Sequence, residues 1–369
     1  MTLLTINTGS TSVKLALFEL STAPAAPRQI SSAPPARETQ HAVKALEALR
    51  AQLPRAPELI AHRVVHGGTG FLKPTLIDSR VLAAIESLTP LAPLHNPQAL
   101  LWIRAALAVW GESIPQLAVF DTAFFANMPR VASEYALATE NGTALGVRRY
   151  GFHGLAHESM WRRWCQLYPA LRGGGRLITL QLGGGCSIAA IEGGQPLDTS
   201  MGFSPLEGLV MARRSGDLDP AVIVYLQRKL SLSAEAVLEL LESHSGLAGV
   251  AGEDANPTQL LDSPDSRAQF AVELYCYRIR KYLGAYMAVL GGCDGIVFGG
   301  GVGEHEPRVR TRALEGLHVF GARLDESRNG AARRGEACLS AEGCPIRIHV
   351  LESNEESILA AAGSAFLAS

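Results

Sequence analysis

Two segments of the sequence share one layout, and this repeat limits the possible folds more than any other feature. The first is TINTGSTSVKLALFEL, which starts at Thr5, and the second is TLQLGGGCSIAAIEGG, which starts at Thr179. In each, an apolar strand enters a turn of glycine and hydroxyl-bearing residues, and a second apolar strand follows. Such a turn displays backbone N–H groups together and suits an anion, usually a phosphate. The repeat therefore predicts a duplicated domain with a phosphate-holding hairpin in each half and a cleft between the halves.

The first hairpin is expected to consist of a strand at residues 3 to 6, a polar turn, and a strand at residues 13 to 20. Lys14 and the polar turn argue against a signal peptide, which needs a continuous apolar core. A third strand runs into glycine in VFGGGVGE, residues 297 to 304, and this form indicates a backbone approach to a nucleotide. None of the three stretches matches the P-loop pattern or the dinucleotide-binding pattern.

Strands and helices alternate along the rest of the chain. Short apolar segments that end in glycine or charge predict strands at residues 59–65, 117–120, 177–182 and 295–298. Helical stretches are expected at residues 81–88, 99–110, 234–241 and 268–290. Residues 21 to 40 are rich in Pro, Ala and Ser, and we expect them to form a surface excursion without chemistry. The alternation predicts an α/β fold.

The composition restricts the class of ligand. The 369 residues are 47% hydrophobic and 18% charged, which allows a large core divided into about two domains. The formal net charge of -2 leaves no basic excess for a nucleic-acid backbone, and no apolar run approaches the roughly 18 residues of a membrane span. The six cysteines are dispersed without metal-ligand spacing, so we expect reduced thiols in a cytoplasmic protein. A small-molecule ligand is therefore expected.

Five polar residues could carry out phosphoryl transfer, which needs cations for the phosphoryl oxygens and carboxylates or amides that place a metal. They are Arg63, Asp121, His153, Arg214 and Glu355. Taken singly, each has a structural alternative. The arginines could form surface ion pairs, the histidine could lie in the core, the aspartate could cap a helix, and the glutamate could be a solvated charge.

Together with the motifs around them, these residues resemble the acetate kinase family, across nearly the whole chain. That family belongs to the actin-like superfamily, which includes the sugar kinases. The motifs are, in order, NTGSTSVK, HRVVHGG, LAPLHNP, VFDTAFF, RRYGFHG, DTSMGFSPLEGL, RSGDLDP, VFGGGVGE and SNEES. The resemblance implies two duplicated actin-like (ribonuclease H-like) α/β domains. It also implies direct, in-line transfer of a phosphoryl group between ATP and a short carboxylate, with Mg²⁺.

The resemblance also implies roles on the acceptor side. Asn7 and Glu355 resemble the metal-placing residues, and Arg63 and Arg214 resemble the cations that hold the carboxylate and the migrating phosphoryl group. His153 resembles the transition-state hydrogen-bond donor. The orienting carboxylate, the secondary histidine and the apolar wall for the acyl group correspond to Asp121, His95, Val65, Leu94, Phe152 and Pro205. Without the resemblance, core packing would explain the apolar residues equally well.

The donor side is implied to consist of the two hairpins and the third glycine stretch. The corresponding residues are Ser10, Ser12, Lys14, Gln181, Gly183, Gly184, Gly185, Gly300, Gly301, Gly303 and Glu304.

The clear departures from the family pattern are all on this donor side. The usual HLGNG is QLGGG at residues 181–185, so a histidine and an asparagine are replaced by Gln181 and Gly184. The usual GIGEN is GVGEH, and Arg213 precedes Arg214 where a small hydroxyl residue is common. The segment GVAGEDANPTQ replaces an Asp-aromatic-Arg element near adenine. The lost imidazole and amide would each supply a hydrogen bond to a charged phosphate oxygen, so we expect Arg213 either to compensate or to point to solvent. Because the element near adenine is also replaced, we expect weak discrimination among bases.

We expect an N-terminal domain at residues 1–122, to which a C-terminal helix at 357–369 returns, and a nucleotide-binding domain at residues 123–356. The expected activity is acetate kinase, with propionate or butyrate as alternative acceptors and GTP or pyrophosphate as alternative donors. A catalytically silent sensor of nucleotide or acyl phosphate is the alternative outside enzymes, because actin-like domains also serve as ligand-gated modules. We further expect a homodimer with no nucleic-acid or membrane partner.

Overall fold

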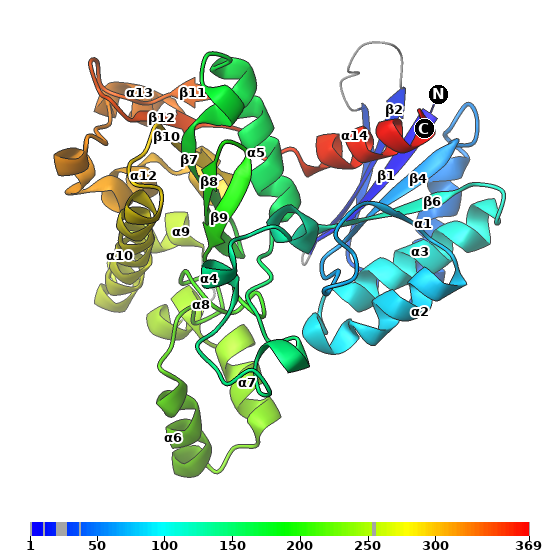
Figure 1. Ribbon diagram of the computed structural model, residues 1–369, viewed down its shortest axis with the longest axis horizontal. Helices are drawn as coiled ribbons and strands as arrows, with labels where there is room; N and C mark the ends of the chain where they lie inside the picture. The colour runs from blue at the N-terminus through cyan, green and yellow to red at the C-terminus, as the bar shows by residue number, and fades with distance from the viewer. Residues whose placement is uncertain (1, 10–11, 20–27, 37, 253–255, 369) are drawn as a thin grey trace. The chain divides into compact units, whose positions relative to one another are not determined.

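The computed structural model describes residues 2–9, 12–19, 28–36, 38–252 and 256–368 (Figure 1). The chain divides into two compact units. The first holds Met1–Ala126, Phe152–Ser159 and Asn354–Ser369, and the second holds Asn127–Gly151 and Met160–Ser353. Each unit is built on one six-stranded sheet.

The sheet of the first unit has the strand order β3-β2-β1-β4-β6-β5. β1 pairs with β2 in antiparallel and with β4 in parallel orientation, and β4 pairs with β6 in parallel orientation. The two outermost pairs, β2–β3 and β6–β5, are antiparallel. The strands are β1 (Thr2–Thr8), β2 (Val13–Glu19), β3 (Arg28–Ala33), β4 (Leu59–Val64), β5 (Thr75–Leu76) and β6 (Gln116–Phe120).

The sheet of the second unit repeats this pattern. Its strand order is β11-β12-β10-β7-β8-β9. From β9 to β11 the successive pairs are antiparallel, antiparallel, parallel, parallel and antiparallel, which is the series found from β3 to β5 in the first unit. The hairpin β7–β8 thus corresponds to β1–β2, and the predicted duplication is confirmed. The strands are β7 (Arg176–Leu182), β8 (Cys186–Glu192), β9 (Gln195–Thr199), β10 (Gly295–Gly299), β11 (Ala337–Cys338) and β12 (Arg347–Val350).

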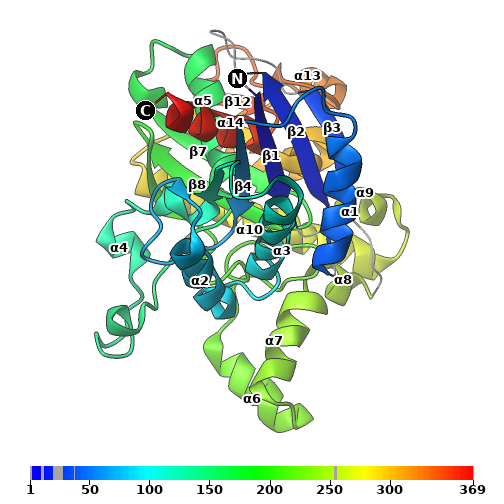
Figure 2. The same ribbon diagram turned by 90° about the vertical axis from the view of Figure 1, so that its right-hand side faces the viewer.

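The first sheet is covered by helices on both faces. Leu4 and Ile6 pack with α1 (Thr39–Arg50) and α3 (Asn96–Trp110), whereas Leu3 packs with α14 (Glu355–Leu367). The three helices can be followed around this sheet in Figure 2. Successive residues of a strand point to opposite faces, so β1 is buried on both. This burial explains why the apolar residues of β1 do not strictly alternate with polar ones along the strand.

In the second unit, α10 (Ser266–Val289) contacts β7, β8 and β9. Val272, Tyr275, Ile279 and Leu283 are buried and recur at intervals of three and four residues along this helix. That spacing places them on one face, so α10 presents an apolar stripe to the sheet.

In the described residues, ten further α-helices connect or flank these elements. They are α2 (Ser79–Ser87), α4 (Arg130–Ser133), α5 (Gly154–Leu167), α6 (Pro220–Leu230), α7 (Ala234–Ser243), α8 (Gly246–Ala251), α9 (Pro257–Asp262), α11 (Gly300–His305), α12 (Pro307–Leu314) and α13 (Glu326–Ala331). No helix in the described part of the chain is long and apolar enough to cross a membrane.

The predicted first hairpin, the four further strands and the four helices are all present with small shifts of their ends. The expectation of a surface excursion at residues 21–40 was wrong for residues 28–33, which form β3 and extend the first sheet beside β2. An edge strand is held by backbone hydrogen bonds, and these do not require an apolar side-chain pattern. The Pro, Ala and Ser content therefore concealed it.

Candidate active site

The β1–β2 hairpin places two of the predicted residues opposite each other. Asn7 precedes the last residue of β1 and is paired in register with Lys14 of β2. Asn7 is buried and Lys14 is exposed. The Gly9 N–H donates to the carbonyl of Ser12 at 2.9 Å and closes the turn. Ser10 lies outside the described residues, so its phosphate contact stays a prediction.

Arg63 and Asp121 form a buried ion pair at the ends of neighbouring strands. Arg63 lies at the end of β4, and Asp121 directly follows β6 as the first residue of the 3-10 helix η2 (Asp121–Phe125). Arg63 Nε donates to Asp121 Oδ1 at 3.1 Å, and Nη2 donates to Oδ2 at 2.5 Å. Nη1 donates to the carbonyl of Thr8 at 2.8 Å. Arg63 is only 7% exposed, which excludes the surface ion pair that its sequence context allowed.

Glu355 brings a second carboxylate to Arg63. Its Oε2 lies 3.7 Å from Arg63 Nε and accepts a hydrogen bond from Asn7 Nδ2 at 2.8 Å. Burial alone would raise the pKa of Glu355, but the charge of Arg63 and the hydrogen bond from Asn7 outweigh it, so the pKa is lowered. Burial raises the pKa of Asp121, and Arg63 opposes that shift. Glu355 is therefore ionised near neutral pH and is not the solvated charge that its sequence context allowed.

Asn7, Glu355 and Glu356 present oxygens suited to a magnesium ion. Asn7 Nδ2 also donates to Glu356 Oε1 at 3.1 Å, which leaves Asn7 Oδ1 buried without a hydrogen-bond partner. Amide and carboxylate oxygens are hard ligands, and Mg²⁺ usually takes only one or two carboxylates, with water and phosphate oxygens completing its shell. The described residues contain no cluster of three or more His, Cys, Asp or Glu side chains placed for a metal. The local chemistry thus fits Mg²⁺ that arrives with a phosphate ligand.

His153 has an unusual backbone conformation just before α5. Its φ of 58° is positive, and Ser231 is the only other non-glycine residue with a positive φ in the described parts of the chain. Residues in this region cost free energy and cluster at functional sites. The following residue, Gly154, approaches Asp121 so closely that a Cβ atom there would overlap the Asp121 carbonyl oxygen. The start of α5 is thereby held against the Arg63–Asp121 pair.

The predicted acyl wall is only partly buried in the first unit. Val65 and Phe152 are 4% and 1% exposed, and the Phe152 ring meets the His66 ring edge-on with centroids 5.5 Å apart. Leu94 is 57% exposed, so the core-packing alternative is wrong for this residue. His95 follows it at the N-cap position of α3.

The β7–β8 hairpin carries the predicted donor residues of the second unit. Gln181 lies on β7, and its Oε1 is buried without a hydrogen-bond partner. The Gly183 N–H donates to the Gly185 carbonyl at 3.0 Å, which closes the turn. Gly184 is exposed, and an added Cβ atom would meet nothing within 4 Å. The turn therefore leaves open space beside Gly184 where a side chain is missing.

The GGGVGE stretch forms the end of β10 and the start of α11. Gly300 has a φ of 74° and approaches the backbone of Leu182, so a Cβ atom there would lie 2.6 Å from the Leu182 carbonyl oxygen. Glu304 Oε1 accepts from the Gly300 N–H at 2.9 Å and from the Ser353 N–H at 3.2 Å. Gly301 is exposed and Gly303 is buried. Glu304 thus fixes its own loop.

Arg214 and Pro205 lie in one long loop of the second unit. Arg214 Nη1 donates to the Pro205 carbonyl at 3.2 Å. Burial lowers the pKa of Arg214, and the charge of Glu242 partly opposes this shift. The loop reaches the phosphate hairpin, because the Ala212 N–H donates to the Gly184 carbonyl at 3.1 Å. The turn at Gly184 and the loop that carries Arg214 are therefore neighbours in the second unit.

Sequence reasoning missed several residues that hold these groups in place. It treated Glu356 only as a neighbour of Glu355, although Glu356 Oε1 lies 3.5 Å from Lys14 Nζ as well as bonding Asn7. It also left out Asn96, whose Oδ1 accepts from the His66 N–H at 3.0 Å and whose Nδ2 donates to the His66 carbonyl. The available signal was their position within the motifs SNEES and LAPLHNP.

Comparisons with protein families and with curated proteins both match acetate kinases. The model of the Acetokinase family matches residues 29–361. The chain is 44% identical over 326 residues to the acetate kinase of Streptomyces coelicolor, which covers 86% of this chain and 80% of that protein.

Two solved structures have the same fold over almost their full length. The crystal structure of the Porphyromonas gingivalis acetate kinase is 32% identical with a TM-score of 0.87, and covers 99% of each chain. That of a Francisella tularensis propionate kinase is 31% identical with a TM-score of 0.85, and covers 98% of each chain. The fold class predicted from the sequence, a two-domain actin-like α/β fold, is confirmed. The buried charges at the strand ends, the paired hairpins and these similarities lead to one conclusion: the chain belongs to the acetokinase family.

Proposed function

We propose that this protein is an acetate kinase that transfers the γ-phosphoryl group of ATP reversibly to acetate, with Mg²⁺, giving acetyl phosphate and ADP. The observation that carries the proposal is the buried guanidinium of Arg63, which is held by Asp121 and lies beside Asn7 and Glu355. Family membership supports the same activity.

Arg63 is suited to hold an anionic substrate. A guanidinium has five N–H groups, and the described residues occupy three of them through Asp121 and the Thr8 carbonyl. The two that remain can donate to a carboxylate or phosphoryl oxygen. The pairing with Asp121 fixes the plane of the group before substrate binds, so little reorganisation is needed as charge spreads in the transition state.

The transfer itself needs positioning more than covalent chemistry. An acetate oxygen forms a bond to the γ-phosphorus while the bond to the bridging oxygen breaks, and the electron pair leaves with ADP. Arg63, Arg214 and His153 would donate hydrogen bonds to the oxygens of the migrating group. Asn7 and Glu355 would hold Mg²⁺, which when bound neutralises charge on the phosphate oxygens. Asp121 orients Arg63 and stays in place throughout.

The donor is proposed to be a nucleoside triphosphate bound by the second unit. The backbone at Gly183–Gly185 and Gly300–Gly303 offers close approach to phosphates and nucleoside, because the open space at Gly184 and Gly301 admits a ligand near the main chain. Because the segment GVAGEDANPTQ replaces the Asp-aromatic-Arg element near adenine, we propose that ATP and GTP are used at comparable efficiency. Pyrophosphate is the less favoured donor.

Propionate is the second candidate acceptor. One of the related solved structures is a propionate kinase. Leu94 is exposed in this chain, so core packing does not close that side of the wall that receives the acyl group. An extra methylene in an apolar pocket changes discrimination by about 1–3 kcal/mol. We therefore propose that acetate and propionate are both used and that longer acids are used poorly.

A matrix of donors and acceptors tests these proposals. Rates would be measured for ATP, GTP and pyrophosphate against acetate, propionate and butyrate at saturating Mg²⁺. Preference for butyrate over acetate would overturn the acceptor assignment. Activity with pyrophosphate alone would overturn the donor assignment, and strong preference for ATP over GTP would show that other residues rebuild the adenine site.

We also propose a cytoplasmic homodimer, on the grounds of the family resemblance and the dispersed thiols. Light scattering of the purified protein measures its mass directly, and a monomer across the working concentration range would contradict the dimer.

A further inference from the structure

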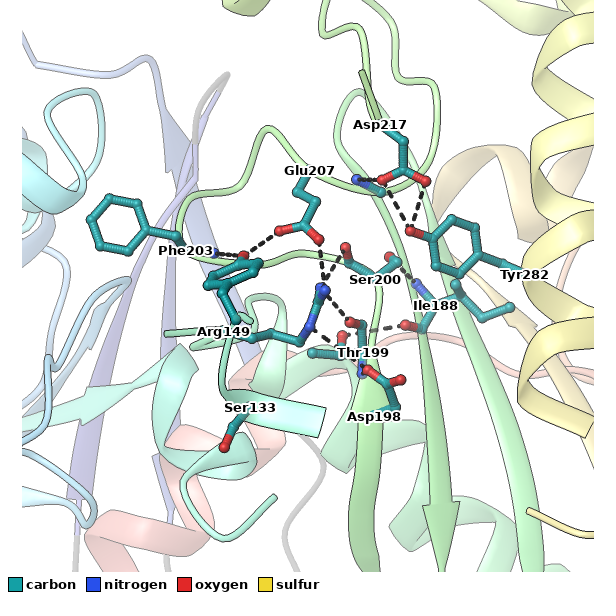
Figure 3. A network of polar contacts seen from close by, with 12 residues as sticks. Ser133, Arg149, Ile188, Asp198, Thr199, Ser200, Phe203, Glu207, Asp217 and Tyr282 are labelled. Carbon is teal, nitrogen blue, oxygen red and sulfur yellow. Dashed lines mark hydrogen bonds and ion pairs between the residues drawn. The ribbon is translucent and has the colours of Figure 1, made fainter. Parts of the chain in front are cut away.

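The loop that carries Pro205 and Arg214 is tied down by side chains that none of the assigned roles includes (Figure 3). Glu207 lies in this loop, and its Oε1 accepts from Arg149 Nη2 at 2.6 Å. Its other oxygen, Oε2, accepts a short hydrogen bond from the hydroxyl of Tyr135. The same hydroxyl accepts from the Phe203 N–H at 2.9 Å. One carboxylate and one phenol thus hold the loop at two points on either side of Pro205.

Arg149 anchors this arrangement to the sheet. Its Nη1 donates to the carbonyls of Thr199 and Ser200 at 3.0 and 3.2 Å, at the end of β9. Its Nε lies 3.8 Å from Asp198 Oδ1. Figure 3 shows Arg149 between Glu207 on one side and Asp198 and Thr199 on the other. Arg149 therefore connects the loop to the end of β9 in the second sheet.

Gly202 shows how closely these groups pack. A Cβ atom at this position would overlap the Glu207 carboxylate and the Tyr135 hydroxyl. The Gly202 carbonyl accepts from the Tyr150 N–H at 2.9 Å. A glycine is thus needed where the carboxylate–phenol pair meets the main chain.

A second set of contacts, around Asp217, holds the far end of the loop. Asp217 Oδ1 accepts from the Gly208 N–H at 2.9 Å, and the Asp217 N–H donates to the Gly208 carbonyl at 3.0 Å. Tyr282 donates to Asp217 at 2.9 Å, and Arg278 Nη1 lies 3.3 Å from Asp217 Oδ2. Both ends of the segment between Gly208 and Asp217, which includes Arg214, are fixed by these contacts.

The hydrogen bond between Arg214 and Pro205 joins the part of the loop held by Tyr135 and Glu207 to the part held by Asp217. Arg214 Nη1 donates to the Pro205 carbonyl, and Pro205 lies between Phe203 and Glu207, the two residues that Tyr135 holds. Burial, together with the neighbouring Glu207 carboxylate, raises the pKa of Tyr135, so the phenol remains a proton donor near neutral pH. Loss of the hydroxyl would leave the Phe203 N–H without its acceptor and free the loop around Pro205.

We propose that Tyr135 and Glu207 are positioning residues for the transfer reaction: they set the place of Pro205 and, through its carbonyl, the direction of the Arg214 guanidinium. This inference rests on the proposed function and deepens it. Neither residue needs to touch the substrate. Their effect is on where the acyl group and the migrating phosphoryl group meet the second unit.

The variant Tyr135→Phe tests the inference with the smallest change. It removes one oxygen and keeps the ring. We expect kcat/KM for acetate to fall by about 10- to 100-fold, because a small displacement of groups that position the reactants can cost about 10²-fold in rate. We also expect the ratio of acetate to propionate turnover to change, because Pro205 is part of the acyl wall. A variant that is only less stable would lower the active fraction and leave this ratio unchanged.

Tyr168→Phe is the matched control. Tyr168 is in the same unit, and its hydroxyl bonds His349 Nε2 at 2.6 Å, away from the loop. The control should keep the acetate-to-propionate ratio of the parent. The inference is overturned if Tyr135→Phe stays within about two-fold of the parent in both readouts, or if Tyr168→Phe shifts the ratio equally.

The partner variant Glu207→Gln checks that the two side chains act together. It keeps the shape of the side chain but leaves a single accepting oxygen, so the side chain can no longer accept from both Arg149 and the Tyr135 hydroxyl. The double variant Tyr135→Phe/Glu207→Gln should lose little more activity than the more severe of the two single variants, because both remove the same interaction. Additive losses would overturn the shared mechanism.

Hydrogen exchange separates this inference from the proposed function. Backbone amides of residues 203–209 should exchange faster in Tyr135→Phe than in the parent and in Tyr168→Phe. If the parent forms no acyl phosphate from any acceptor, the proposed function fails, and the exchange data then decide the loop inference alone. Unchanged exchange in Tyr135→Phe would overturn it.

Discussion

Arg63 is 7% exposed, and a guanidinium so far from water must be paired to persist. Asp121 supplies that pairing through two hydrogen bonds, and Glu355 adds a second negative charge at 3.7 Å. The arrangement is costly as a purely structural device, because a buried ion pair can often be replaced by apolar packing without loss of stability. At the residue scale, this pairing is better explained by a need for a fixed cation than by stability.

Arg214 should act in the transition state more than in substrate binding. A cation that contacts the migrating phosphoryl group stabilises the charge that spreads in the transition state more than it stabilises bound acetate. Arg214→Ala should therefore lower kcat on the order of 10²–10⁴-fold. Arg163→Ala is a matched control, because Arg163 is a partly exposed arginine of the same unit paired with Glu336, and it should change kcat little. A kcat for Arg214→Ala within a few-fold of the parent, with only KM raised, would refute the role.

The residue types of the site could be predicted from the sequence, but their contacts could not. Asn7 and Glu355 were assigned together by family resemblance, and they are in fact hydrogen-bonded across 348 positions of the chain. Tyr135 lies in none of the motifs, and Glu207 is a residue of DTSMGFSPLEGL to which no role was assigned. A tyrosine and a glutamate in loops are usually surface residues, and only the fold reveals that the Tyr135 hydroxyl donates to Glu207 and accepts from the Phe203 N–H.

At the scale of elements, the start of α5 is where packing and chemistry are most tightly linked. Gly154→Ala should destabilise the protein by about 1–3 kcal/mol, the usual cost of an overpacked position, because its Cβ atom would overlap the Asp121 carbonyl. Activity should fall as well, since Asp121 orients Arg63. Urea unfolding and kcat measured on the same preparation check both effects.

Gly284→Ala is the control for that substitution. Gly284 lies inside α10, and an added Cβ atom would meet nothing within 4 Å. Alanine is favoured over glycine within a helix by roughly 0.5–1 kcal/mol, so this variant should be at least as stable as the parent. Equal destabilisation by the two substitutions would contradict the steric explanation.

The pairing of β4 with β6 predicts a sensitivity to acid. His62 on β4 is buried and bonds Gln116 of β6 at 2.7 Å between Nε2 and Oε1. Burial lowers its pKa to about 4 from the usual value of 6.5, and the hydrogen bond that His62 donates to Gln116 only partly opposes this. A depressed folded-state pKa means that the unfolded chain takes up the proton first. The stabilisation is therefore complete above pH 6.5 and is lost as the pH falls toward 4.

His62→Gln removes this titration. Between about pH 7.5 and about pH 5, the parent should lose about 2 kcal/mol more free energy of unfolding than the variant does. Urea midpoints of both proteins at the two pH values give the comparison. Parallel losses in parent and variant would show that other groups control the acid response.

Elements with an apolar pattern were predictable, and those held by backbone alone were not. The four further strands and four helices expected from periodicity all form, because each buries the face that its pattern marks. β3 was missed because its partner is the backbone of β2. The positive φ of His153 was equally hidden, since the sequence around it contains glycines that could each have taken the turn.

At the scale of the whole molecule, the duplication gives both units a sheet of the same topology. Two sheets with the same series of strand pairings place a hairpin at equivalent positions, β1–β2 and β7–β8. The repeat in the sequence was sufficient to predict this, because the layout of strand, polar turn and strand depends on local residues. The division of the chain into domains at residue 122 stays a prediction.

The proposed acetate kinase activity is most directly tested by trapping acetyl phosphate as its hydroxamate. With ATP, acetate and Mg²⁺, the purified parent should form the hydroxamate at a steady rate, and removal of Mg²⁺ with a chelator should abolish it. Arg63→Ala should lower the rate on the order of 10²-fold or more, because the fixed cation is lost. No hydroxamate from the parent with any nucleotide donor would contradict the assignment as an acetate kinase, and an Arg63→Ala rate equal to that of the parent would contradict the role of the buried ion pair.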